Sequence, residues 1–295
     1  MWTLVRFTLT ANFGEKPNRN AMKSMKEPSV LLLIPAYNEE ARIAPVLEEY
    51  AQYFRKSYTG SFSLLVVLNG CRDNTIGVVR AAHEKYPEVR YMNFDEPIGK
   101  GGALIEGLKY YHEADYIGYV DADGATGPAA FHDLIRHSCE ADCVFGSRWL
   151  PDSVIHQSQE SKRQFASRCF HLIVQTLFWM NIKDTQCGAK LIRREAAEAV
   201  QNQLTIADMA FDINLLYALK KKGFTLKEIP TEWTDKIGTK VVLGRTSLTM
   251  LLSVIRLRVI YSPFFKPFRF ILTPISTYLY KKLAAPHRNY KGDEK

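Results

Sequence analysis

Cysteine is scarce in this chain, and long apolar runs are absent from it. The five cysteines among 295 residues are odd in number and scattered from Cys71 to Cys187, so we expect reduced thiols in a cytosolic setting and no disulfide framework. No stretch reaches the roughly 18 uninterrupted apolar residues that a membrane-spanning helix requires. Internal repeats and low-complexity segments are also missing. The length then favours one large α/β domain with appendages over a pair of small domains.

A zinc site is suggested by residue types but disfavoured by their spacing. Cys139 and Cys143 follow His132 and His137 closely in the sequence. Their spacing matches no standard zinc finger. We therefore expect an amphipathic helix with buried cysteines over this stretch.

Positive charge is in excess and is concentrated near the C-terminus. The formal net charge is +8, and from Lys236 onward lysine and arginine far outnumber aspartate and glutamate. Over residues 264–270, phenylalanines alternate with Lys266 and Arg269. Such an apolar and basic mixture indicates an anionic partner, either nucleic acid or a lipid headgroup surface. Because the chain has no recognised nucleic-acid-binding motif, we expect an anionic membrane surface and no nucleic acid.

Three regions follow from these patterns. Residues 1–28 are expected to be a flexible tail, residues 29–243 the folded domain, and residues 244–295 a basic amphipathic segment. The last region begins with a strongly apolar helix, predicted over residues 247–260. The sequence leaves two alternatives for this helix: it lies on the membrane, or it packs against the domain.

Short apolar strands alternate with helical segments along the first half of the chain. The predicted strands are residues 30–34, 62–68, 89–94 and 116–120, and helices are predicted over residues 39–55, 74–86 and 102–112. In the less regular second half, strands are predicted at residues 142–147 and 224–230, helices at 165–180 and 208–221, and a loop feeding a short strand at 184–191. The alternation predicts an α/β fold with a mostly parallel sheet and helices on both faces. Ligands of such sheets bind at the carboxyl ends of the strands.

Two carboxylates one residue apart leave the predicted central strand. Asp121 and Asp123 are followed by Gly124, which supplies a turn that lets both side chains reach one ion. Carboxylate oxygens are ligands for Mg²⁺ or Mn²⁺, and such an ion holds a diphosphate. The alternative is a polar strand exit or a helix N-cap, where aspartate is also favoured.

Polar segments at the ends of the other predicted strands complete a recognisable pattern. The segments are Pro35-Ala-Tyr-Asn-Glu-Glu40, Asn69-Gly-Cys-Arg-Asp-Asn-Thr75, Ile98-Gly-Lys-Gly-Gly102 and Asp121-Ala-Asp-Gly-Ala-Thr126. Together they resemble the nucleotide-sugar site of the family 2 glycosyltransferases, which have the GT-A fold. Later segments narrow the resemblance to the dolichyl-phosphate β-glucosyltransferase and polyprenyl-phosphate glycosyltransferase branch: Gly146-Ser-Arg148, Asp184-Thr-Gln-Cys-Gly-Ala-Lys190, Ala210-Phe-Asp-Ile-Asn-Leu-Leu216 and Trp233-Thr-Asp-Lys-Ile-Gly-Thr-Lys-Val241.

The resemblance implies a nucleotide sugar bridged by Mg²⁺ or Mn²⁺ to the protein. Asp123 and Asp121 would hold the metal, and Lys100 at a glycine-rich helix start suits a phosphate anion. The remaining residues expected to bind the nucleotide sugar are Pro35, Tyr37, Glu39, Asn69 and Gln186. For Glu39 the alternative is a favourable charge in the first turn of a helix.

The acceptor implied by the resemblance is a polyprenyl or dolichyl phosphate. Arg148 and Arg163 are the candidates to grip its phosphate, with Lys240 as a third, because guanidinium groups form paired bonds to phosphate oxygens. The expected reaction is an inverting hexose transfer that yields a β-glycosyl phospholipid. A phosphate monoester is already an anion and needs no general base. An alcohol acceptor would need one, and Asp212 is the candidate catalytic base in that case.

One departure from the family pattern leaves the donor open. Family members usually carry paired aspartates at the end of the second strand, whereas this chain has Leu68-Asn69. UDP-glucose is the favoured donor and GDP-mannose the alternative. A soluble or glycan acceptor is the alternative to the lipid. With a lipid acceptor, we expect a peripheral enzyme at the cytoplasmic face of a membrane.

Overall fold

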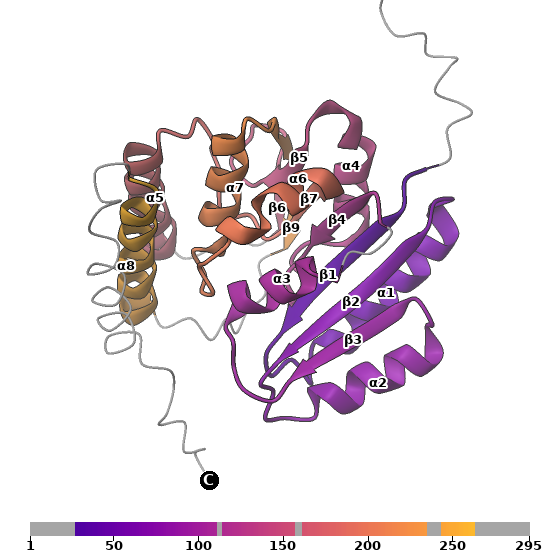
Figure 1. Ribbon diagram of the computed structural model, residues 1–295. Coiled ribbons are helices and arrows are strands. Elements are labelled where there is room, and N and C mark those ends of the chain that lie inside the picture. Colours follow the sequence, from indigo (N-terminus) through magenta and orange to yellow (C-terminus); the bar gives the residue numbers. More distant parts are fainter. Residues whose placement is uncertain (1–26, 111–113, 157–160, 235–242, 263–295) are drawn as a thin grey trace, which may run out of the picture.

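A seven-stranded sheet forms the centre of the protein, which we describe from a computed structural model (Figure 1). The structure describes residues 27–110, 114–156, 161–234 and 243–262. Along the sheet the strand order is β3-β2-β1-β4-β7-β5-β8. The strands are β1 (Val30–Ala36), β2 (Phe62–Asn69), β3 (Val89–Phe94), β4 (Tyr116–Tyr119), β5 (Cys143–Ser147), β7 (Lys190–Arg193) and β8 (Leu226–Pro230). A small second sheet pairs β6 (Val154–His156) with β9 (Glu232–Thr234).

The sheet is parallel except at β7, which confirms the predicted fold class. Strands β1, β2, β3 and β4 pair in parallel, as do β5 and β8. Strand β7 runs antiparallel to both of its neighbours, β4 and β5. Because β7 runs the opposite way, the loop that precedes it lies at the edge where β4 ends. That edge carries the candidate site.

Helices cover both faces of the sheet. They are α1 (Ile43–Ser57), α2 (Thr75–Lys85), α3 (Lys100–Leu108), α4 (Pro128–Arg136), α5 (Ser161–Phe178), α6 (Arg194–Val200), α7 (Phe211–Lys222) and α8 (Leu243–Tyr261). The side chains of β1 alternate between the two faces, as the pleat of a strand requires. Leu31 and Leu33 pack into a core with α3, α6 and α7, whereas Leu32 and Ile34 pack into a second core with α1 and α4. Burying one such side chain stabilises the fold by about 1.5–3 kcal/mol.

Several predicted boundaries were wrong. The first helix begins at Ile43, because residues 39–42 form a separate turn in which the amide of Arg42 donates to the carbonyl of Glu39. The third helix begins at Lys100 and ends at Leu108, earlier than predicted. The predicted helix around Cys139 and Cys143 is also wrong. Cys139 lies exposed in a 3-10 turn, and Cys143 begins the buried strand β5.

The apolar helix near the C-terminus packs against the domain. Helix α8 lies beside α5 (Figure 1), and its Val254 and Leu257 are fully buried in the core. The packing alternative therefore holds for this face of the helix. The rest of the predicted basic segment (263–295) and residues 1–26 of the predicted tail lie outside the described residues. Within the part of the chain that the structure describes, the helices are too short or too polar to cross a bilayer.

Candidate active site

The predicted polar segments meet at the carboxyl edge of the parallel strands. In the sheet, Ala36 at the end of β1 lies beside Leu68 of β2, and Leu33 lies beside Tyr119 at the end of β4. Asp121 and Asp123 follow β4 directly and are both half-buried. Gly124 adopts a positive φ of 71°, so the expected turn is present. The edge therefore presents two carboxylates among the loops of three neighbouring strands.

Lys100 lies against the first of these carboxylates. Its Nζ is 2.5 Å from Oδ1 of Asp121. Burial lowers the pKa of Lys100, but the negative charges of Asp121, Asp212 and Asp123 outweigh it and leave this pKa above its ordinary value. Gly99 allows the approach, because it has a φ of 80° and a Cβ there would lie 2.2 Å from the carbonyl oxygen of Ala207. The start of α3 thus places the Lys100 ammonium group beside the carboxylates.

Asp123 is a carboxylate that favours a cationic partner. Burial and the charge of Asp121 raise its pKa above the usual aspartate value, and the amide of Ala125 and the charges of Arg42 and Lys100 only partly oppose this. Asp123, with this electrostatic cost, and the neighbouring Asp121 are suited to a divalent cation, which both can bind through hard oxygen atoms.

The donor set fits Mg²⁺ or Mn²⁺ held jointly with a ligand. Among the residues that the structure describes, no third histidine, cysteine, aspartate or glutamate joins the pair to complete a metal cage. Mg²⁺ typically takes one or two protein carboxylates and completes its shell with water and substrate phosphates. Asp121 and Asp123 therefore fit a metal whose other ligands come from a diphosphate.

The loop before β7 packs directly on Asp121. Gly188 lies so close that a Cβ at this position would be 2.2 Å from Oδ2 of Asp121. Gln186 lies half-buried two residues earlier in the same loop. The antiparallel direction of β7 thus places the predicted residue Gln186 on the side of the site opposite β1.

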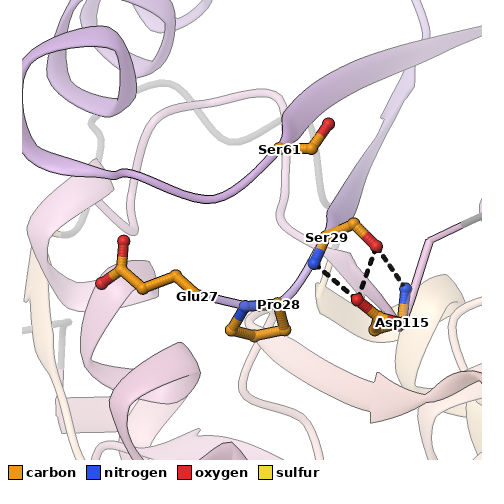
Figure 2. Close-up of a pocket in the computed structure, with 5 residues that line it drawn as sticks. All are labelled: Glu27, Pro28, Ser29, Ser61 and Asp115. Carbon is orange, nitrogen blue, oxygen red and sulfur yellow. Dashed lines mark hydrogen bonds between the residues drawn. The ribbon is translucent and has the colours of Figure 1, made fainter. Parts of the chain in front are cut away.

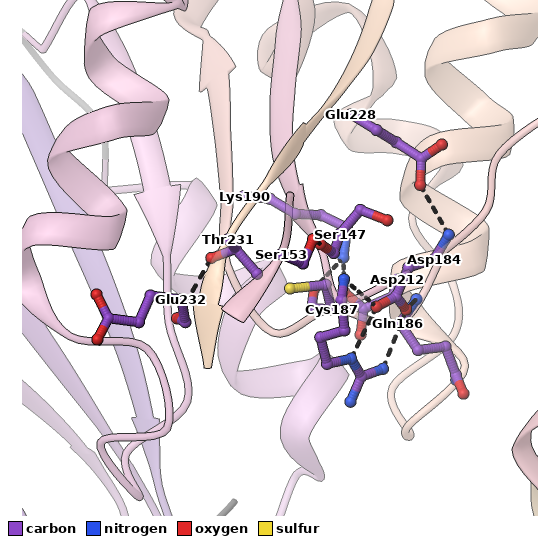
Figure 3. Close-up of polar contacts among 11 residues, drawn as sticks. Ser147, Ser153, Asp184, Gln186, Cys187, Lys190, Asp212, Glu228, Thr231 and Glu232 are labelled. Carbon is purple, nitrogen blue, oxygen red and sulfur yellow. Dashed lines mark hydrogen bonds and ion pairs between the residues drawn. The ribbon is translucent and has the colours of Figure 1, made fainter. Parts of the chain in front are cut away.

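Arg148 and Asp184 form a nearly buried ion pair. Arg148 donates from Nε to Oδ2 at 2.7 Å and from Nη2 to Oδ1 at 3.0 Å. Glu228 of β8 accepts a bond from the amide of Asp184 at 2.7 Å and so fixes its backbone (Figure 3). Burial raises the pKa of Asp184, but the charge and hydrogen bonds of Arg148 outweigh it and keep the pKa below its usual value. The Arg148 guanidinium also lies over the ring of Trp233 at 5.0 Å.

Asp212 is buried at the start of α7 and is already hydrogen-bonded. Its Oδ1 accepts from Lys190 Nζ at 2.5 Å and from the hydroxyl of Tyr119. Burial raises the pKa of Asp212, but the charges of Lys190 and Lys100 outweigh it and lower this pKa below its usual value. Asp208, one turn earlier, points elsewhere: it accepts from the amide of Ala210 and from Ser253.

The residues predicted to bind the nucleoside differ in their surroundings. Tyr37 is exposed and Pro35 half-buried at the end of β1. Glu39 is held by Arg42, whose Nε and Nη2 each donate to it at 2.7 Å. Asn69 is buried, and its Oδ1 accepts the amide of Ile98 at 2.7 Å. Asn69 thereby ties the end of β2 to the segment that carries Lys100, and its contact with a base stays a prediction.

Two of the predicted acceptor residues cannot be placed. Arg163 belongs to α5, but its side chain lies outside the described part, and so does Lys240. Two other residues of the site were missed from sequence. Arg42 acts on Asp123 through its charge, and its only sequence signal was its place three residues after Glu39. The sequence signal for Lys190 was its own charge at the start of a short apolar strand.

A separate hollow lies at the opposite edge of the sheet (Figure 2). It has a volume of about 230 Å³ and is lined by Glu27, Pro28, Ser29, Ser61 and Asp115. Ser29 precedes β1 and Asp115 precedes β4, and the Ser29 amide and hydroxyl both donate to the Asp115 carboxylate at 2.7 Å. These bonds join the amino ends of two strands, so the hollow is distinct from the carboxylate site.

Comparisons with known proteins agree with this geometry. The model of the family described as glycosyl transferase family 2 matches residues 31–201. The dolichyl-phosphate beta-glucosyltransferase of Dictyostelium discoideum is 33% identical over 242 residues, covering 78% of this chain and 74% of that protein. The protein of the same name from Mus musculus is 30% identical over 250 residues, covering 80% of this chain and 76% of its own length.

A solved structure shares the fold at low sequence identity. The glucosyl-3-phosphoglycerate synthase of Mycobacterium tuberculosis, solved with Mn²⁺, UDP and phosphoglyceric acid, superimposes with a TM-score of 0.59 at 15% identity, covering 78% of each chain. The fold, the family match over more than half of the chain and the relatives lead to one conclusion. The chain belongs to glycosyl transferase family 2.

Proposed function

We propose that this protein transfers glucose from UDP-glucose to dolichyl or another polyprenyl phosphate, giving a β-glycosyl phospholipid and UDP. The observation that carries the proposal is the Asp121, Asp123 and Lys100 cluster at the carboxyl edge of the sheet. It stands in a chain whose relatives over about three quarters of its length are named dolichyl-phosphate beta-glucosyltransferases. The cluster supplies the donor site, and the relatives suggest the acceptor.

On the donor side, the protein neutralises the diphosphate. Asp121 and Asp123 would hold Mg²⁺ or Mn²⁺, which supplies positive charge to the departing diphosphate. Lys100 lies at the first residue of a helix, where backbone amides also favour an anion. The structural relative solved with Mn²⁺ and UDP supports this choice of metal and nucleotide. Pro35, Tyr37, Glu39, Asn69 and Gln186 are proposed to surround the rest of the donor.

On the acceptor side, no proton has to be removed. The second pKa of a phosphate monoester is about 6, so its oxygen is already an anion at neutral pH. That oxygen attacks the anomeric carbon in line. The new carbon–oxygen bond forms as the bond to the diphosphate breaks, so the configuration inverts and UDP leaves. The burial of Asp212 and its bonds to Lys190 and Tyr119 favour this route, because a base for an alcohol acceptor has to reach the substrate.

Arg148 is proposed to meet the acceptor phosphate. Its pairing with Asp184 holds the guanidinium plane beside the loop that contacts Asp121. A guanidinium fixed in this way grips phosphate oxygens with little loss of side-chain freedom. Arg163 and Lys240 remain further candidates from the sequence.

The experiment offers each donor with the same lipid. Full-length protein is incubated with Mn²⁺, a short polyprenyl phosphate and, in separate reactions, UDP-glucose, GDP-mannose or UDP-N-acetylglucosamine, and lipid extracts are analysed by mass spectrometry. We expect glucosylated lipid from UDP-glucose. Product from GDP-mannose alone would correct the donor, which the Leu68-Asn69 departure left open. Sugar transferred only to water-soluble acceptors would overturn the proposal.

Two aspartate variants test whether the loss of activity is specific to the candidate site, one in the site and one on the surface. Asp123→Asn is expected to lower the rate of lipid product formation by roughly 100- to 1,000-fold. Asp133→Asn removes an aspartate that pairs with Arg136 on the surface of α4, and it is expected to retain activity.

We also propose that the protein binds peripherally to an anionic membrane at its cytoplasmic face. Leu172 on α5 is 64% exposed, Ile255 on the neighbouring α8 is 46% exposed, and Trp179 just after α5 is 83% exposed. Exposed apolar and tryptophan side chains with a net positive charge favour a bilayer interface. Flotation with phosphatidylserine vesicles tests this: Trp179→Ser should reduce binding, and Thr176→Ala, at an exposed polar position of α5, should not.

A further inference from the structure

A lysine is fully buried beneath the candidate site. Lys190 opens β7 with a side chain that is 0% exposed. Its Nζ lies 2.5 Å from Oδ1 of Asp212 and 2.7 Å from the carbonyl oxygen of Cys187. Burying an ammonium costs several kcal/mol that a paired carboxylate only offsets, and an apolar side chain of similar size is often the more stable choice. Core packing alone therefore does not explain a lysine here.

Both hydrogen-bond partners of Lys190, Asp212 and the Cys187 carbonyl, are linked to Asp121. Asp212 lies close enough to Lys100 for its negative charge to act on that ammonium, and Lys100 in turn lies 2.5 Å from Asp121. The Cys187 carbonyl belongs to the residue before Gly188, which packs against Oδ2 of Asp121. Lys190 is thus linked to one oxygen of Asp121 through the packing of the Cys187–Gly188 turn, and to the other through the charge of Asp212 acting on Lys100.

Tyr119 is part of the same arrangement and lies in β4, the strand that Asp121 follows. It is the last residue of β4 and pairs with Lys190 across the antiparallel register of β4 and β7. Its hydroxyl donates to the oxygen of Asp212 that Lys190 also contacts. The end of β4, the start of β7 and the start of α7 are therefore joined at Asp212 Oδ1. Figure 3 shows Lys190 beside Asp212 at this junction.

We propose that Lys190 is a positioning residue for the donor site, which holds Asp212 beside Lys100 and the Cys187–Gly188 turn against Asp121. It does not touch the donor itself. This inference rests on the proposed function, because it assumes that Asp121 and Lys100 receive a metal-bound nucleoside diphosphate. Partners that orient metal-binding carboxylates in this way typically change metal affinity or activity by roughly 10- to 100-fold when they are removed.

The test compares Lys190→Met with a core variant of the same strand. Lys190→Met keeps the length of the side chain and removes its charge. Ile192→Ala, two residues along β7, empties a fully buried position of the core and leaves the contacts of Lys190 in place. Calorimetry on the full chain measures the Kd for UDP in the presence of Mn²⁺, and thermal unfolding gives Tm. Donor and acceptor KM are measured alongside.

A positioning role predicts a specific pattern. Lys190→Met should raise the Kd for UDP by roughly 10- to 100-fold and raise the donor KM, while the acceptor KM stays unchanged. Ile192→Ala should lower Tm and leave the Kd unchanged. If Lys190→Met does not fold, the double variant Lys190→Met/Asp212→Asn removes both buried charges together, which is the milder change. It should show the same loss of UDP binding.

Two results overturn the inference in distinguishable ways. Wild-type Kd in a folded Lys190→Met or double variant, with Tm lowered, would show that Lys190 only stabilises the fold. In that case the donor site stands. If wild-type protein binds neither UDP nor GDP with Mn²⁺, the proposed function fails and the inference fails with it.

Discussion

Two pairs of aspartates surround the site, and they are in opposite electrostatic states. Asp121 and Asp123 follow the parallel strand β4 and are half-buried, and burial with mutual repulsion raises the pKa of Asp123. Asp184 and Asp212 flank the antiparallel strand β7 in the sequence and are almost fully buried, and Arg148 and Lys190 lower their pKa values. Asp184 and Asp212 are each paired with a cation of the protein. In the first pair Lys100 contacts Asp121, but the pKa of Asp123 stays raised, so this pair still favours an added cation.

This difference separates the carboxylates expected to bind the metal from the carboxylates that stabilise the fold. Parallel strands deliver their loops to one edge of a sheet, where ligands bind. Strand β7 instead brings the loop that carries Gly188 against Asp121 and places the buried Lys190 on Asp212 beneath that edge. Substitutions at Asp184 or Asp212 should therefore mainly lower the stability of the fold. Substitutions at Asp121 or Asp123 should mainly lower the activity.

The largest stability effect is expected for Asp184→Asn. The substitution leaves the Arg148 guanidinium largely buried without its carboxylate, and breaking a buried ion pair in this way costs about 3 kcal/mol or more. Urea unfolding measures the change. The double variant Arg148→Met/Asp184→Asn, which removes both charges, should recover part of the loss. A single variant as stable as wild type would contradict the expectation that this pair stabilises the fold.

The largest activity effect is expected for Asp123→Asn. Removing the carboxylate weakens charge stabilisation at the departing diphosphate, and losses of this kind amount to roughly 100- to 1,000-fold in kcat. Initial rates of lipid glucosylation measure it, with the surface variant Asp133→Asn as the control. The fold should remain intact, because the side-chain oxygen of asparagine can still accept the hydrogen bond from the amide of Ala125. Full activity would remove the first pair from the chemistry.

A smaller effect is expected where the two regions touch. In Gly188→Ala the new methyl group would overlap Oδ2 of Asp121 at 2.2 Å, so the carboxylate or the loop has to move. We expect the Kd for UDP with Mn²⁺ to rise about tenfold, as for other changes next to metal-binding groups. Gly127→Ala is the matched control, since a Cβ there has no neighbour within 4 Å. Equal behaviour of the two variants would show that the close packing of Gly188 has no role in binding.

The sequence predicted the first region better than the second. Asp121 and Asp123 follow a predicted strand, and Lys100 lies just before the predicted third helix; parallel strands bring such ends together without further information. The pairing of Lys190 with Asp212 could not be predicted, because it depends on β7 entering the sheet antiparallel between β4 and β5. Asn69 shows the same limit: its place at a strand end was evident, but its bond to the amide of Ile98 depends on how two loops pack.

The smallest effect concerns the pH dependence of stability, and Asp123 and Asp184 should differ in its sign. Asp184 has a lowered pKa, so it stabilises the fold above the ordinary aspartate value of 3.8 and this contribution is lost as the pH falls through its folded value. Asp123 has a raised pKa, so its ionisation costs stability at neutral pH and the cost disappears in acid. Asp123→Asn should therefore raise the free energy of unfolding at pH 7 slightly, and the gain should vanish as the pH falls below the ordinary aspartate value of 3.8. Urea unfolding across this range measures both. An Asp123→Asn variant that is less stable than wild type at pH 7 would show that this carboxylate also supports the fold, and the contrast between the two pairs would then fail.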